Sequence, residues 1–251
     1  MVVLKTPEQL QYMKRAGEIT AHALLKARDA IRVGISTAEL DKIIRAYIER
    51  CGATPSFLGY GGFPASACIS LNHQVIHGIP SPQVCLREGD IVKVDVGACY
   101  RGYHGDSART FAVGRISAAA QRLIEVTEQC FRRGVAKARP GNRLGDIGAS
   151  VQSHAESNGF SVVRTFVGHG VGSALHEPPD VPNYGTPGRG TRLYAAMTLA
   201  IEPMINEGTP DVRVLDDGWT VLTADGKLSA HYEHTVAITP EGPWLLTDVG
   251  E

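Results

Sequence analysis

The sequence lacks the features that would place the protein in a membrane, on nucleic acid or outside the cell. Its 251 residues contain no apolar run of about 18 residues, the length that suggests a membrane span. The net charge is −1 and no polybasic run is present, so nothing favours nucleic acid or an anionic membrane surface as a partner. The segment from Met1 to Glu8 has no apolar core of signal-peptide length, and we expect no export leader.

Cysteine is scarce and scattered. The five cysteines, at positions 51, 68, 85, 99 and 130, form no Cys-x-x-Cys pair, which argues against a cysteine zinc site. An odd and dispersed set fits free thiols in a reducing compartment better than a disulfide framework. We therefore expect a cytoplasmic protein.

The rest of the chain has the composition of a globular domain. Hydrophobic residues make up 43% of it, enough for a sizeable core, and no linker divides it, so we expect residues 1–251 to form a single domain. Helices are predicted in two pairs, over residues 7–30 and 37–51 and then 117–138 and 144–157. Each pair precedes strand-like segments. This weak repeat favours two α+β halves that face each other across a shared sheet.

A hairpin between Ile91 and Val113 carries the clearest chemical signal. Both arms alternate with period two, and the intervening segment holds three glycines, which predicts a hairpin with a loop or bulge. Such a hairpin can bring Asp95 and Asp106 together on one sheet face. Two carboxylates that close repel each other unless they share a proton or a cation, and an apolar strand is a poor place for an unpaired charge. A bound metal explains the pair; the alternative is two solvated acids at the edge of an exposed sheet.

Two glutamates and a histidine extend this pattern in the second half. Glu202 and Glu233 each stand in an alternating apolar segment that predicts a strand. His169 lies between two glycines, where little side-chain bulk blocks approach. Four oxygen donors and one imidazole suit Mn, Fe, Co or Zn better than they suit a thiolate site. Two such ions, about 3.5–4 Å apart, could hold and activate one water between them.

Taken in order, these motifs resemble those of the type I methionine aminopeptidases, within the creatinase/prolidase superfamily. The segments that carry the resemblance are His77-Gly78-Ile79-Pro80, Val94-Asp95-Val96-Gly97, Gly168-His169-Gly170-Val171-Gly172, His176-Glu177-Pro178, Ile201-Glu202-Pro203-Met204 and Asp217-Gly218-Trp219-Thr220. Each is weak alone, but the ordered set spans nearly the whole chain. The resemblance implies an α+β pita-bread fold, with two pseudo-symmetric halves around a central, curved, mostly antiparallel sheet and helices on the outside.

The same resemblance implies a metallo-exopeptidase that removes the initiator methionine from nascent proteins and peptides, favouring a small uncharged second residue. A water held by two divalent ions (Co, Mn, Fe or Zn) would attack the first peptide bond. Asp95 would chelate one ion, Asp106 and Glu233 would bridge both, and His169 and Glu202 would complete the second site. Glu202 would also be the general base. Nascent chains would be the partners; the resemblance allows a transient ribosome contact, and we expect a monomer.

Two accessory histidines are implied as well. His77 and His176 would orient the scissile amide and stabilise the developing oxyanion. Without the resemblance, either could be a histidine in a surface loop.

A thioether pocket would be lined by Tyr60, Phe63, Cys68 and Trp219, whose shapes and polarisability suit methionine. The chain departs from the family at two positions. Phe63 stands where a tyrosine is common, and Leu175 stands where a larger aromatic is common. Either change could loosen the pocket slightly, and neither affects a metal ligand.

Three other interpretations are compatible with the sequence. An Xaa-Pro peptidase on the same fold would need a proline-shaped pocket and usually an extra amino-terminal domain, which we do not expect because the first helix begins near the start of the chain. A binding module that had lost its chemistry should also have lost metal ligands, and all five are present. A structural α+β domain with solvated acids would bind no metal.

Overall fold

Two helices open the chain in the computed structural model, which describes residues 2–250. Helix α1 (Pro7–Ala30) begins with a capping box: Gln9 donates its backbone N–H to Thr6 Oγ1, and the Gln9 side chain accepts from the Thr6 N–H. Helix α2 (Thr37–Arg50) begins in the same way, with Ser36 and Glu39 as the reciprocal pair. Because these bonds join residues three apart, the sequence alone specifies where both helices begin.

A four-stranded antiparallel sheet follows the first helix pair. Its strands are β1 (Thr54–Pro55), β2 (Ala67–Leu71), β3 (Ile91–Tyr100) and β4 (Tyr103–Ala112), with a 3-10 helix, η1 (Tyr60–Gly62), between β1 and β2. Strand β3 is the centre: β1 and β2 pair with one of its edges, and β4 pairs with the other. The predicted hairpin is therefore confirmed as β3–β4.

The hairpin turn is tighter than the loop or bulge expected. Arg101 and Gly102, both with left-handed backbone, connect the strands directly. Gly97 and Gly105 lie inside the strands instead of in a loop. A Cβ at Gly105 would meet the backbone nitrogen of Gly17 in α1 at 2.6 Å. Gly105 thus lets α1 pack directly against β4.

The second half repeats the order of two helices followed by strands. The helices are α3 (Ala118–Val135) and α4 (Leu144–Ser157). The strands are β5 (Ser161–Val162), β6 (Gly168–Gly170), β7 (Glu177–Val181), β8 (Thr198–Ile201), β9 (Met204–Asn206), β10 (Val212–Val214), β11 (Val221–Thr223), β12 (Ser229–His231), β13 (His234–Thr239) and β14 (Gly242–Leu245). They form a five-stranded sheet in the order β14-β13-β8-β6-β7, a three-stranded sheet in the order β12-β9-β5, and the pair β10-β11.

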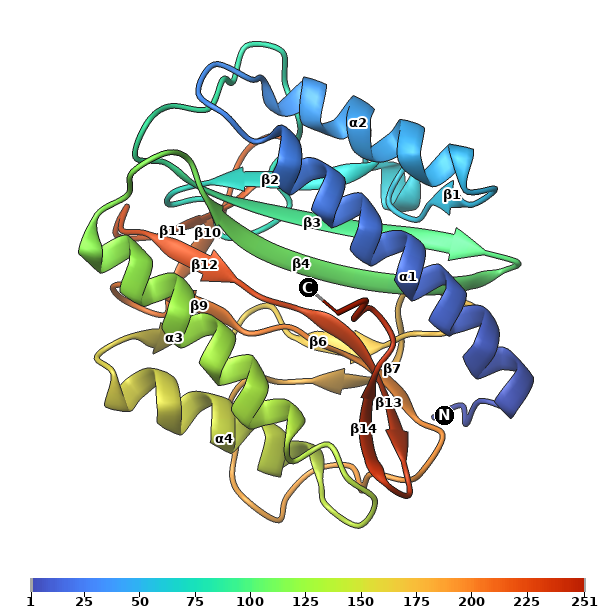
Figure 1. Ribbon diagram of the computed structural model, residues 1–251. Coiled ribbons are helices and arrows are strands. Elements are labelled where there is room, and N and C mark those ends of the chain that lie inside the picture. Colours follow the sequence, from blue (N-terminus) through green and yellow to red (C-terminus); the bar gives the residue numbers. More distant parts are fainter. Residues whose placement is uncertain (1, 251) are drawn as a thin grey trace.

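Side-chain hydroxyls join the two halves along β4, which lies beside β12 and β13 (Figure 1). Thr235 Oγ1 accepts from the Asp106 N–H and donates to the Asp106 carbonyl, with both distances 2.9 Å. Ser107 Oγ donates to the Glu233 carbonyl at 2.6 Å. The Glu233 N–H donates to the Ala108 carbonyl at 2.8 Å. This seam fixes the candidate metal ligands of one half against those of the other.

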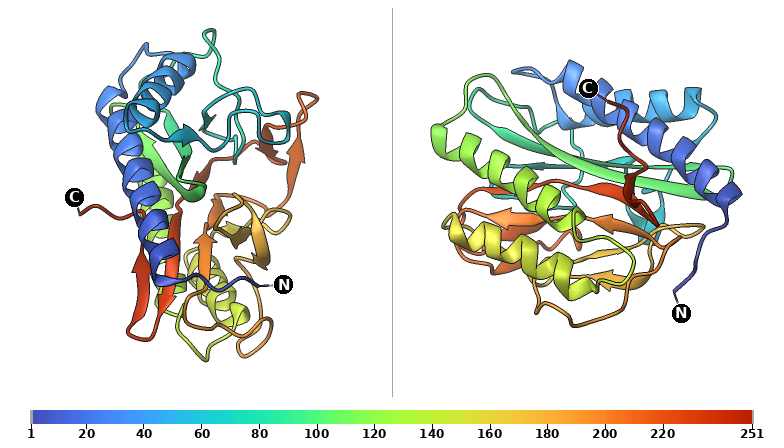
Figure 2. Two further views of the ribbon diagram at one scale, coloured as in Figure 1. Left: turned by 90° about the vertical axis from the view of Figure 1, so that its right-hand side faces the viewer. Right: turned by 60° about the horizontal axis from the view of Figure 1, so that its bottom comes forward.

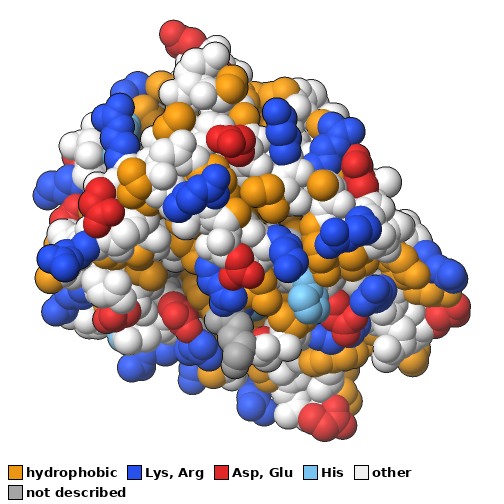
Figure 3. All heavy atoms as spheres, turned by 45° about the horizontal axis from the view of Figure 1, so that its top comes forward, with side chains coloured by type: hydrophobic (Ala, Val, Ile, Leu, Met, Phe, Trp, Pro, Cys, Tyr) orange, Lys and Arg blue, Asp and Glu red, His pale blue; other side chains and the backbone are white. Residues whose placement is uncertain are grey.

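Helices α1, α2, α3 and α4 pack over the outer faces of the sheets. In Figure 1, α1 and α2 cover the first-half sheet while α3 and α4 cover strands of the second half; Figure 2 gives two further views of these layers. On the face in Figure 3, basic and acidic side chains are interspersed, in keeping with the net charge of −1. No helix within residues 2–250 is long and apolar enough to cross a membrane.

Candidate metal centre

Asp95 and Asp106 are diagonal neighbours on one face of the β3–β4 hairpin. Asp95 is opposite Ala108 and Asp106 is opposite Gly97. The two carboxylates therefore belong to successive cross-strand pairs on the same face of the sheet. The Oδ1 atom of each is buried, and neither atom has a hydrogen-bond partner within the described chain. Buried polar atoms rarely stay unsatisfied in native proteins. Both carboxylates therefore have an oxygen available for a ligand that the protein itself does not supply.

His169 presents a nitrogen to the same space from the second half. It occupies the middle of β6, where it pairs with Ala200 of β8. Its Nδ1 lies 2.8 Å from the Gly170 carbonyl, which can only accept a hydrogen bond, so Nδ1 carries the proton. The lone pair is then on Nε2, which lies 3.9 Å from Asp106 Oδ2 and 3.6 Å from Glu202 Oε1. A histidine held in this tautomer by a backbone carbonyl is typical of metal ligands.

Glu202 and Glu233 occupy links between two sheets, and the prediction of strand for these residues is wrong. Glu202 follows the end of β8, and Pro203 after it has no N–H to offer a neighbouring strand. Glu233 precedes β13 and gives its N–H to Ala108 on β4. The two-residue links 202–203 and 232–233 both carry the chain between the five-stranded and the three-stranded sheet. The apolar alternation continued through both links, which explains the wrong prediction.

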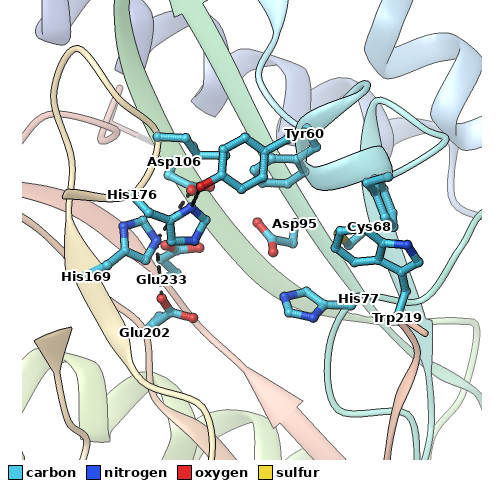
Figure 4. Close-up of a pocket in the computed structure, with 13 residues that line it drawn as sticks. Tyr60, Cys68, His77, Asp95, Asp106, His169, His176, Glu202, Trp219 and Glu233 are labelled. Carbon is cyan, nitrogen blue, oxygen red and sulfur yellow. Dashed lines mark hydrogen bonds and ion pairs between the residues drawn. The ribbon is translucent and has the colours of Figure 1, made fainter. Parts of the chain in front are cut away.

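The donors converge from both halves of the chain. Ligand atoms of Asp106, His169 and Glu233 all lie within 4.8 Å of one another, and the three side chains are buried. Glu202 and Asp95 line the same pocket (Figure 4). Carboxylate oxygens and a neutral imidazole are suitable donors for Mn, Fe, Co or Zn. The unsatisfied carboxylate oxygens and this donor set fit divalent cations.

Burial makes this cluster of acids costly without a cation. It raises the pKa of Asp106 to about 7. Burial first, and neighbouring acids second, raise the pKa values of Asp95, Glu202 and Glu233. Burial also lowers the pKa of His169 to about 3, so its imidazole is neutral at pH 7 and available as a ligand. The acids cannot all be charged at neutral pH unless positive charge is supplied.

An apolar chamber opens beside the metal-binding end of the pocket. In Figure 4 the cluster around His169 lies at one end, Cys68 and Trp219 lie at the other, and Asp95 lies between them. The whole pocket, with its metal-binding end included, is about 180 Å³, below the roughly 300–1,000 Å³ of pockets for drug-sized ligands. It therefore suits a single side chain. Its apolar and aromatic wall residues are Phe57, Tyr60, Phe63, Cys68, Leu175 and Trp219.

The two accessory histidines also line the pocket. His176 stacks near His169, with ring centroids 3.9 Å apart, and its Nδ1 lies 2.9 Å from the Tyr60 hydroxyl. His77 lies across the pocket with its ring edge-on to Trp219. Burial lowers the pKa of His77 to about 4, so it is neutral at pH 7. The structure thus brings every predicted site residue into one cavity.

Sequence reasoning missed one neighbour of the site, His231, and named no specific role for Phe57, which also lines the pocket. His231 is 1% exposed, and its Nε2 lies 3.5 Å from Glu202 Oε2. A signal for His231 was present, because it stands two residues before Glu233 in an alternating segment.

Comparisons with known proteins agree with this geometry. The family described as metallopeptidase family M24 matches residues 11–240. The methionine aminopeptidase of Clostridium perfringens is 56% identical over 247 residues, which are 98% of this chain and 99% of that protein. The crystal structure of methionine aminopeptidase from Thermotoga maritima has a TM-score of 0.97 at 44% identity and covers 99% of this chain and 100% of its own.

A more distant likeness extends to the prolidases. The prolidase of Pyrococcus furiosus has a TM-score of 0.81 at 25% identity, and the match covers 99% of this chain but 66% of the prolidase. Both structural likenesses confirm the α+β pita-bread fold expected from the sequence.

Proposed function

Because the chain belongs to metallopeptidase family M24 and matches methionine aminopeptidases along its whole length, we infer that it removes the amino-terminal methionine from peptides and proteins. It is a metal-dependent aminopeptidase. The observation that carries this conclusion is the convergence of five candidate ligands in one pocket that also has an apolar end. The metal-binding end supplies the groups for hydrolysis, and the apolar end can bind a thioether side chain.

Two divalent ions, drawn from Co, Mn, Fe and Zn, would be held by Asp95, Asp106, His169, Glu202 and Glu233. When bound, such ions supply a Lewis acid for the scissile carbonyl and lower the pKa of water. The positive charge would also allow all four buried acids to ionise at neutral pH. Residues 1–251 would act as one catalytic domain, because the ligands come from both sides of the β4 seam.

Glu202 is the best-placed general base. The residue is 9% exposed, and Oε1 and Oε2 lie 3.6 and 3.5 Å from the Nε2 atoms of His169 and His231 respectively. Contacts on both oxygens restrict its rotation, so that it can receive a proton at a defined position. His77 and His176 approach from opposite sides of the pocket, where each could hold the scissile amide and donate to the developing oxyanion.

Specificity for methionine would come from shape and dispersion. Phe63 and Trp219 meet edge to face with centroids 5.1 Å apart, and they form the apolar end together with Cys68 and Leu175. The side chain of the second residue would have to pass between His77 and His176, which favours a small uncharged residue there. We place the enzyme in the cytoplasm as a monomer acting on nascent chains; the free thiols of its five cysteines agree with a reducing compartment.

The test is peptide hydrolysis with controlled metal. Purified protein is stripped of metal, reconstituted separately with Mn, Fe, Co and Zn, and given Met-Ala-Ser and Ala-Pro-Ser. We expect methionine release from the first peptide, dependence on added metal, and little cleavage of the second. Faster cleavage of Ala-Pro-Ser would favour an Xaa-Pro peptidase, and hydrolysis of neither peptide with any metal would contradict the proposed function.

A further inference from the structure

A buried ion pair ties the amino-terminal arm of the chain to the turn that carries His176. Lys5 Nζ donates to Glu177 Oε2 at 2.6 Å, and the two side chains are only 3% and 10% exposed. Lys5 precedes α1, and its backbone N–H donates to the Ala196 carbonyl at 2.8 Å. Both the backbone and the side chain of Lys5 are therefore fixed, and its ammonium group contacts the turn that precedes β7.

Glu177 folds the turn with its other carboxylate oxygen. Oε1 accepts from the Ala174 N–H at 3.2 Å and from the Ser173 hydroxyl at 3.4 Å. A Cβ at Gly172 would overlap both the Glu177 carboxylate and the Lys5 side chain, so a side chain there would displace this pair. Residues 172–177 are thus wrapped around a single carboxylate, and Lys5 balances its charge.

His176 is the next residue in the chain before Glu177, so this turn sets its backbone position. The His176 ring contacts His169, which is a candidate ligand, and its Nδ1 bonds to Tyr60 across the pocket. Tyr60 belongs to η1 in the first half and restrains only the ring. The backbone of His176 is restrained by Glu177, which pairs with Gly170 of β6 through its backbone and with Lys5 through its side chain.

We propose that Lys5 is a positioning residue, whose ammonium group fixes Glu177 and thereby holds His176 at the distance from the metal-binding end that catalysis requires. This inference rests on the proposed function, since it assigns His176 to the peptide bond. A charge-assisted hydrogen bond of this length is strong and directional. Without the ammonium, Glu177 would be a buried carboxylate lacking its cation, and the turn would rearrange to hydrate it. Small displacements of catalytic groups lower turnover strongly.

The first experiment compares Lys5→Met with wild type and with Lys14→Met on the Met-Ala-Ser peptide. Methionine keeps the length of lysine and removes the charge. Lys14 is a matched control, because it lies within α1 and outside the pocket, and its Nζ also bonds to backbone, donating to the Leu246 and Asp248 carbonyls. We expect kcat to fall about tenfold in Lys5→Met with KM within twofold, and both constants to stay within twofold in Lys14→Met. Release of methionine by the wild type tests the proposed function separately.

A double-mutant cycle identifies the route of the effect. If Lys5 acts through His176, then Lys5→Met should cost nothing further in a His176→Ala background. The same tenfold loss in both backgrounds, or an unchanged kcat in a folded Lys5→Met protein, overturns the proposal. Should Lys5→Met fail to fold, Lys5→Met/Glu177→Met removes both charges together and is expected to show the same tenfold loss, whereas wild-type turnover in that protein overturns the proposal.

A second readout does not depend on activity. Hydrogen exchange of metal-free protein reports the Ala174 amide, which donates to Glu177. We expect the peptide covering residues 172–177 to exchange at least tenfold faster in Lys5→Met, with no change in Lys14→Met. Equal protection in all three proteins would contradict the assignment.

Discussion

The Nε2 atom of His169 lies 3.9 Å from Asp106 Oδ2, although β6 and β4 belong to opposite halves of the chain. Neither half holds the whole cluster. The seam along β4 places Glu233 against the hairpin that carries Asp95 and Asp106. The candidate metal centre therefore depends on the docking of the halves, and metal binding and tertiary packing should be thermodynamically linked.

Asp106→Asn tests that linkage. The substitution keeps the shape but removes a carboxylate that is 3% exposed and central to the cluster. We expect at least a hundredfold loss of affinity for Mn or Zn in calorimetric titration, together with loss of peptide hydrolysis. Asp29→Asn is the control, because Asp29 is exposed at the end of α1 and forms an ion pair with its neighbour Arg28, away from the pocket. Equal metal affinity in both variants would remove Asp106 from the metal site.

Metal-free protein should lose stability as pH rises. The pKa of Asp106 is raised from 3.8 to about 7 by burial, so between those values the folded state retains a proton that the unfolded state releases. The contribution of Asp106 to the free energy of unfolding is therefore greatest below about pH 4. It falls as pH rises towards 7, by on the order of a few kcal/mol. Urea unfolding of stripped protein from pH 4.5 to 7.5 measures the slope.

Two comparisons isolate the source of that slope. Asp106→Asn has no proton to lose at this position, so its stability should fall less steeply over the same window. Saturating divalent metal should reverse the trend in the wild type, because ligation favours the charged carboxylates. A metal-free wild type that gains stability steadily up to pH 7.5, in parallel with the variant, would contradict the prediction.

Trp219→Ala should damage substrate binding while sparing the metal. The indole forms one wall of the apolar end and packs edge-on to Phe63 at 5.1 Å. Removing it should raise KM for Met-Ala-Ser about tenfold, with a smaller effect on kcat, because the lost contacts are made equally before and during the reaction. Metal affinity should remain that of the wild type. The other tryptophan, Trp244 on β14, is outside the pocket, and Trp244→Phe is the matched control.

The sequence predicted those parts of the molecule that depend on neighbouring residues. The helix starts expected at residues 7 and 37 are those of α1 and α2, and period-two alternation predicted the β3–β4 hairpin with Asp95 and Asp106. Alternation failed at Glu202 and Glu233, because Pro203 follows Glu202 at the end of β8 and the Glu233 N–H bonds to Ala108 on β4.

Contacts between distant segments left little trace in the sequence. Lys5 and Glu177 are 172 residues apart, and no local pattern links them. His231 stood in a predictable position, but its contact with Glu202 exists only because β12 and β9 pair. The resemblance to a known family supplied the assignment of His77 and His176, which periodicity and spacing alone could not.

Gly105→Ala tests the close approach of α1 to β4. A methyl group there would meet the Gly17 backbone at 2.6 Å, and backbone atoms of a packed helix cannot yield cheaply. Overpacking of this kind costs about 1–3 kcal/mol, and we expect that loss in urea unfolding. Ser153→Ala, at an exposed position of α4, should change stability by less than about 0.5 kcal/mol. A Gly105→Ala protein as stable as wild type would show that α1 can shift on the sheet.

The positions of Glu202 and Glu233 bear on how such an enzyme can evolve. Each glutamate sits in a connection of two residues between sheets, so the length of that connection sets where its carboxylate points. Insertion or deletion of a single codon there would redirect the acid even if every amino acid were retained. Substitution of an apolar neighbour would only replace one packed side chain with another and would leave the direction of the carboxylate unchanged. Over generations the spacing of these connections should therefore tolerate less change than the residues around them.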